Sequence, residues 1–131
     1  MLVADDVPEA RRTVIYKAVS VFWHLGARHI YVQDVPASSA AVSGLPHEGV
    51  VAVVAAPPPR SQVDGWTEVL AEDGWLFAAE VRLSDDSVRC ACHELGHALG
   101  LAHDPRPSNL MFEVNLATAT EITSEQIESI L

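Results

Sequence analysis

Apolar residues recur at helical spacing in the first part of the chain. Between Pro8 and Leu25 they stand at Ala10, Val14, Ala18, Val21 and Leu25. Spacings of three and four residues predict a helix with one buried face. Asp6 is placed to cap this helix, Pro8 suits its first turn, and Gly26 follows as a stop signal. We therefore expect a helix over 8–25 that packs through this stripe.

Two stretches after this helix have the pattern of strands. His29 to Val35 contains the β-forming residues Ile30, Tyr31 and Val32. Gly49 to Ala56 is apolar on both alternating faces, which is typical of a central strand covered on both sides. Three consecutive prolines follow and end this strand, because proline cannot continue a hydrogen-bonded ladder. The small, turn-rich residues 36–48 predict a loop between the two strands.

A β-hairpin is indicated next. Trp66 to Ala71 and Trp75 to Leu83 have strand character and are separated by Asp73-Gly74, a favoured hairpin turn. The hairpin places two antiparallel strands directly before the helix that follows.

The last third of the chain predicts two helices around an irregular segment. The polar run Ser84 to Ser87 offers caps for a helix over 88–99, which Gly100 ends. Residues 101–120 contain two prolines and predict irregular structure. A final short helix begins near Thr123, with Gln126 placed as its capping-box partner.

Length and cysteine content indicate a small globular protein. The chain has 131 residues, about half of them apolar, which fits one domain over residues 1–131 with its own core. The two cysteines, Cys90 and Cys92, are two positions apart on a predicted helix, so their side chains point in different directions and a bond between them is not expected. The absence of a disulfide framework is consistent with a reducing compartment.

The acidic net charge of the chain argues against two classes of binding partner, nucleic acids and anionic membranes. The chain carries 8 Lys and Arg against 18 Asp and Glu, a formal net charge of −10. Nucleic acids and anionic membranes attract clustered basic residues, so neither is expected as a partner. No apolar run approaches the ~18 residues of a membrane span, and the N-terminus lacks the pattern of a secretory signal. We expect a cytoplasmic monomer as the chain stands, with a secreted, processed form as the alternative.

The segment His93-Glu94-Leu95-Gly96-His97 carries the chemistry. His93 and His97 are four residues apart on the predicted helix, so their imidazoles lie on one face and can reach one Zn²⁺. Glu94 stands beside the first histidine, where a general base is wanted. A catalytic zinc site needs a third protein ligand and one open position.

His103 is the candidate for that third ligand. Ten residues of continuous helix would carry it about 15 Å from His93, so the chain must turn sharply after His97. Gly100 is placed to allow the turn, because glycine tolerates the left-handed conformation that ends a helix. The spacing, the glycine and the third histidine therefore predict one zinc site.

These residues resemble the metzincin metallopeptidases, whose signature extends His-Glu-x-x-His by a glycine and a third histidine. Met111, in Asn109-Leu110-Met111-Phe112, fits the methionine turn that lies beneath zinc in that family. The alternative for Met111 is an ordinary core methionine. In size the chain is most similar to minimal bacterial matrixin-like or snapalysin-like enzymes.

The resemblance also implies a fold and a role for Asp104. The expected α/β fold, of the α+β zincin type, has a twisted, mostly parallel sheet with an antiparallel edge strand. A backing helix, the active-site helix, the methionine turn and a C-terminal helix complete it. Only Met1 to Asp5 is available for the family's first strand. Asp104 is similar to the residue found in adamalysin-type enzymes, and we expect it to orient a ligand or to act structurally.

The resemblance further implies a peptidase mechanism. Zn²⁺ on the three histidines activates water, and Glu94 acts as general base and then acid in hydrolysing a peptide bond. A peptide or protein substrate would pair with the strand formed by Trp66, Thr67, Glu68, Val69, Leu70 and Ala71. Phe112, Glu113 and Val114 would border a side-chain pocket.

Other interpretations remain at this point. The chain is alternatively a catalytically inactive zinc-binding module, or an intracellular regulatory peptidase of another zincin group that takes its third ligand from elsewhere. Asp85 and Asp86 are candidates for a Ca²⁺ site, although helix capping explains them better. Surface or hydrogen-bonding roles are expected for His24, His29 and His47.

Overall fold

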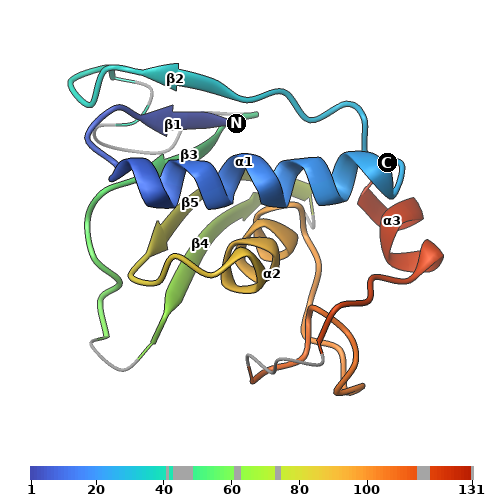
Figure 1. The fold of residues 1–131 in the computed structure, drawn as a ribbon. Coiled ribbons are helices and arrows are strands. Elements are labelled where there is room, and N and C mark those ends of the chain that lie inside the picture. Colours follow the sequence, from blue (N-terminus) through green and yellow to red (C-terminus); the bar gives the residue numbers. More distant parts are fainter. Residues whose placement is uncertain (41, 43–48, 61–62, 73–74, 115–118, 131) are drawn as a thin grey trace.

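The structure, a computed structural model, describes residues 1–40, 42, 49–60, 63–72, 75–114 and 119–130 of the chain. Its elements in chain order are β1 (Leu2–Ala4), α1 (Glu9–His24), β2 (Gln33–Val35), β3 (Val51–Val54), β4 (Gly65–Glu72), β5 (Trp75–Leu83), α2 (Val88–Ala98) and α3 (Ser124–Ile130). Figure 1 shows α1 running across the sheet, with α2 beside it and α3 at the end of α1 near the C-terminus.

The five strands form one mixed sheet in the order β2-β1-β3-β5-β4. All neighbouring pairs are parallel except β4 and β5, which are antiparallel, so β4 forms an antiparallel edge. This is the α/β architecture that the resemblance implied, and the prediction is confirmed. The predicted central strand is β3, and the burial of both Ala52 and Val53 shows that its two faces are covered.

The helices α1 and α2 share one face of the sheet. Ile15 and Ala18 of α1 meet Val53 and Val81 of the sheet and Leu95 of α2 around one small internal space. These side chains belong to the main hydrophobic cluster of buried residues. The sheet and α1 thus form the surface on which α2 is held, with its histidine-bearing side turned away from this core.

The predicted stripe on the first helix is wrong in part. The buried residues of α1 are Val14, Ile15, Ala18, Val19 and Phe22. Ala10 and Leu25 are exposed, so the helix turns a different face inward. Burying Ile15, Val19 and Phe22 removes more apolar surface from water than burying the smaller residues of the predicted stripe would. The free energy gained from the hydrophobic effect is therefore larger for the observed face.

Two local predictions at the ends of elements are also wrong. Asp6 does not cap α1, because the N-cap residue is Pro8 and the helix has no side-chain capping hydrogen bond at this end. The strand predicted over His29–Val35 is confined to β2, and Tyr31 is 75% exposed. Only the last three residues of that segment pair with β1.

The later elements agree with the sequence patterns. Ser87 caps α2 by accepting a hydrogen bond from the Cys90 N–H at 3.3 Å. The capping box of α3 is present, since Gln126 N–H donates to Thr123 Oγ1 at 3.2 Å and Thr123 N–H donates to Gln126 Oε1 at 2.9 Å. The Asp73-Gly74 turn lies outside the described residues. Among the described helices, none is long and apolar enough to cross a membrane.

Candidate metal centre

The end of α2 determines where the third histidine lies. Gly100 has φ +97°, and its N–H donates to the His97 carbonyl at 2.9 Å. The Leu101 N–H donates to the Gly96 carbonyl, also at 2.9 Å. These two bonds form a Schellman motif, which ends the helix and reverses the chain. The predicted role of Gly100 is thus borne out by its backbone conformation.

The reversal brings three histidines together. The ligand atoms of His93, His97 and His103 all lie within 4.8 Å of one another. Among the described residues this is the one group of three or more histidine, cysteine or acidic side chains that converges in this way. His93 and His97 are half-buried, whereas His103 is exposed.

Main-chain carbonyls fix the tautomers of the two helical histidines. The His93 Nδ1 donates to the Leu110 carbonyl at 2.7 Å, and the His97 Nδ1 donates to the Leu101 carbonyl at 2.8 Å. A carbonyl oxygen only accepts, so both protons are at Nδ1 and both Nε2 atoms carry lone pairs. Outer hydrogen bonds of this kind orient histidine ligands in metal sites.

The Nε2 atoms then face each other. They are 3.0 Å apart, and in these tautomers neither carries a proton that could join them. A tetrahedral ion 2.0–2.1 Å from each nitrogen would hold two of them about 3.3 Å apart. A cation between the two lone pairs therefore suits the observed arrangement, and three imidazoles suit zinc better than calcium, which prefers oxygen ligands.

Burial favours the metal-binding state of these imidazoles. It lowers the pKa of His93 and of His97, although the bond to the Leu110 or Leu101 carbonyl and nearby charges modify the effect. A lowered pKa keeps each ring neutral at neutral pH. Since a metal binds the neutral form, the site does not have to lose protons before it takes up an ion.

Glu94 is buried beside the histidines. It is 7% exposed, and burial raises the pKa of its carboxyl group, while the hydrogen bond from Thr67 and the nearby His97 and His103 oppose that rise. The Thr67 hydroxyl donates to Glu94 Oε2. This side chain belongs to the strand β4 that is predicted to pair with substrate, and it lies against the glutamate.

Met111 is fully buried against α2. A Cβ at Gly96 would lie 3.1 Å from Met111 Cε and still closer to the sulfur. The turn that presents Met111 is closed by Phe112 N–H, which donates to the Asn109 carbonyl at 3.0 Å. The preceding residue of this turn, Leu110, supplies the carbonyl that orients His93.

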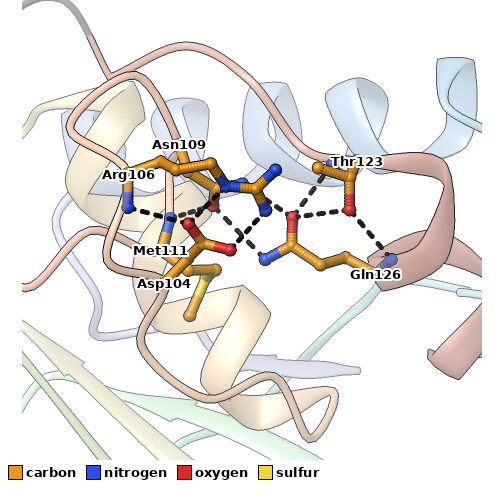
Figure 2. A network of polar contacts seen from close by, with 6 residues as sticks. All are labelled: Asp104, Arg106, Asn109, Met111, Thr123 and Gln126. Carbon is orange, nitrogen blue, oxygen red and sulfur yellow. Dashed lines mark hydrogen bonds and ion pairs between the residues drawn. The ribbon is translucent and has the colours of Figure 1, made fainter.

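A polar network joins this turn to α3, as Figure 2 shows. Asn109, which is 1% exposed, accepts a hydrogen bond from the Met111 N–H at 2.8 Å. Its Nδ2 donates to Gln126 Oε1 at 2.8 Å, the same oxygen that completes the capping box of α3. The C-terminal helix therefore supports the turn on which Met111 and the His93-orienting carbonyl are placed.

Asp104 takes part in a different contact. Its carboxylate accepts from the Arg106 backbone N–H at 2.9 Å and from the guanidinium at 2.8 and 2.5 Å (Figure 2). These bonds hold the pKa of Asp104 at about 2. The Asp104 N–H donates to the Met111 carbonyl at 2.9 Å, which ties the segment after His103 to the Met111 turn.

A cleft of about 480 Å³ opens over the histidines. It is lined by Val63, Asp64, Gly65, Trp66, Thr67, Cys90, His93, Glu94, His97, His103, Glu113 and Val114. Of the predicted substrate residues, Glu68, Val69, Leu70, Ala71 and Phe112 do not line it. The sequence reasoning missed Val63, Asp64, Gly65 and Cys90, of which only the glycine, at the start of a strand, carried a recognisable signal.

The remaining histidines and the cysteines lie in ordinary surroundings. The His24 ring is 2.7 Å from the Ser20 carbonyl on α1, and His29 is exposed. His47 lies outside the described residues. Cys90 and Cys92 are free and buried, and only Cys90 lines the cleft.

The fold and the histidine cluster are those expected of a zinc metallopeptidase. Comparison with family models gives a match to the matrixins over residues 37–130, which includes β3, β4, β5, α2 and α3. The chain belongs to the matrixin family. No curated protein sequence matches it. The family match confirms the metzincin resemblance and agrees with its matrixin-like alternative.

Proposed function

We propose that this protein is a zinc-dependent endopeptidase. The observation that carries the proposal is the pair of Nε2 atoms on His93 and His97, whose lone pairs face each other beside His103 and Glu94. When bound there, zinc would lower the pKa of a water ligand and polarise the scissile carbonyl. His93, His97 and His103 would hold the ion.

Glu94 would move the proton. Its carboxylate lines the same cleft as the three histidines, next to His93 in the chain. A carboxylate in this position accepts a proton from the attacking water and delivers it to the leaving amine. The hydrogen bond from Thr67 favours the charged form of Glu94 that this role requires, against the effect of its burial.

Met111 would form the floor of the site. Its burial against Gly96 places an apolar side chain under the helix that bears His93 and His97. This packing supports the assignment of Met111 to a methionine turn. We infer that its role is to support the helix, since its sulfur is packed against α2.

The substrate would be a peptide bound in extended form along β4. Among the described strands β4 pairs only with β5, so its other edge offers unpaired main-chain groups. Trp66 lines the cleft at this edge, while Glu113 and Val114 line it beyond Met111. Asp64 and Glu113 contribute acidic groups to the cleft, and neither lysine nor arginine is among the described residues that line it. We therefore expect neutral and basic peptides to be preferred over acidic ones.

A peptide-library assay with zinc-loaded protein tests the proposal. The wild type should cleave peptides, and acidic members of the library should be the poorest substrates. Glu94→Ala should retain zinc and lose at least a hundredfold in kcat, in keeping with the usual contribution of a general base. Equal activity of the variant would remove Glu94 from the mechanism. A wild type that binds zinc but cleaves nothing would favour a non-catalytic zinc-binding module.

A further inference from the structure

The carboxylate of Glu94 is held by two residues of the edge strand. Residues two apart on a strand point to the same face, so Gly65 and Thr67 both face α2 across the cleft wall. The Thr67 hydroxyl hydrogen-bonds to Glu94 Oε2 and is 3.1 Å from the Glu94 carbonyl oxygen. Both ends of this contact come from regular elements, β4 and α2.

Gly65 provides the space for this arrangement. A Cβ at this position would lie 2.6 Å from Glu94 Cγ and 2.9 Å from its Oε1. The same atom would lie 3.0 Å from the Cys90 sulfur. Only glycine fits at position 65 without a steric clash, because any side chain there would displace the Glu94 side chain or the strand β4.

Thr67 has the properties needed to fix a carboxylate. It is β-branched, so its χ1 angle is restricted, and it sits on a strand. Among the described residues it is the one hydrogen-bond donor to the Glu94 side chain, and it binds Oε2. The other oxygen, Oε1, is thereby left to accept a proton from water.

We propose that Thr67 is a positioning residue for Glu94. Through its hydroxyl it restricts the rotation of the glutamate side chain and holds the carboxylate in the orientation used for proton transfer. The inference rests on the proposed peptidase function. It gives Thr67 a role toward Glu94, whereas the family resemblance implied only that Thr67 belongs to the strand that pairs with substrate. A displacement of about 1 Å in a reacting group costs on the order of a hundredfold in rate, so this constraint bears directly on kcat.

The test compares Thr67→Val with Thr67→Ser. Valine keeps the shape of threonine and removes the hydroxyl, whereas serine keeps the hydroxyl. We expect Thr67→Val to lower kcat 10–100-fold, the usual range for outer contacts of this kind, with KM and bound zinc within twofold of wild type. Thr67→Ser should retain most of the activity.

Thr13→Val is the matched control, because Thr13 is exposed on α1 and its hydroxyl bonds only to the Glu9 carbonyl of the same helix. It should leave kcat unchanged. Melting temperatures of all variants show whether each one folds.

Each outcome decides a separate question. Wild-type kcat in Thr67→Val, or equal loss in the valine and serine variants, would overturn the role of the hydroxyl and leave the peptidase proposal intact. A raised KM with unchanged kcat in Thr67→Val would indicate that Thr67 binds substrate instead. Loss of bound zinc in this variant would indicate that Thr67 has a structural role. A zinc-loaded wild type without peptidase activity would overturn the proposed function and this inference with it.

Discussion

Gly96, within α2, lies directly against the side chain of Met111. A Cβ at position 96 would be 3.1 Å from Met111 Cε and closer to its sulfur, while the sulfur-bearing side chain itself is fully buried. Glycine inside a helix costs about 0.5–1 kcal/mol relative to alanine. The close approach of Met111 explains why the helix bears a glycine between Glu94 and His97.

Gly96→Ala should therefore destabilise the protein although it improves helix propensity. We expect the free energy of unfolding to fall by about 1–3 kcal/mol, the usual cost of adding a methyl group to a packed core. Denaturant unfolding of the metal-free protein measures this. In the Met111→Ala background the cost of Gly96→Ala should shrink, because the clashing atoms are gone. A Gly96→Ala protein more stable than wild type would contradict the packing described here.

The link between α3 and the Met111 turn is tested at Gln126. Gln126→Ala leaves the buried Nδ2 of Asn109 without the partner that it has at 2.8 Å and removes half of the capping box. We expect a loss of about 1–3 kcal/mol in the free energy of unfolding, the cost of an unsatisfied buried polar group. Glu128→Ala, on the exposed side of the same helix, is the control and should change it little. Equal effects of the two variants would contradict the network.

Alkylation tests the two thiols. Burial raises the pKa of both Cys90 and Cys92 to about 12, and for Cys90 the nearby acidic groups add to the effect. The reactive thiolate is therefore scarce at pH 8, where an unperturbed cysteine is partly ionised. Iodoacetamide should label both cysteines slowly in the folded protein and rapidly in denaturant. Fast labelling of Cys90 in the folded state would contradict the raised pKa of its thiol.

The sequence predicted the order of the elements and the three histidines, because each depends on local patterns or fixed spacings. The reversal after His97 was predictable from Gly100, whose φ of +97° is the conformation that glycine favours. The buried face of α1 was mispredicted, because several apolar stripes compete on this helix and only tertiary packing chooses among them. Asp6 was placed to cap α1, but the helix begins too late, at Glu9, for it to do so.

The hydrogen bonds that orient the histidines and Glu94 were not predictable from the sequence. The carbonyls of Leu101 and Leu110 orient His97 and His93, yet every residue has a carbonyl, so nothing in the sequence distinguishes these two. The bond from Thr67 to Glu94 joins residues on different elements whose register is set by the whole sheet. Gly65 carried a weak signal, since a glycine at the start of a strand often marks close approach.

The most direct test of the central claim is a zinc titration of the metal-free protein with a competing chelator. The wild type should bind one zinc per chain, and His103→Ala should bind it far more weakly, with His24→Ala as the control that leaves affinity unchanged. Circular dichroism would confirm that all three proteins are folded. A folded wild type that binds no zinc, or a His103→Ala variant with wild-type affinity, would contradict the three-histidine site.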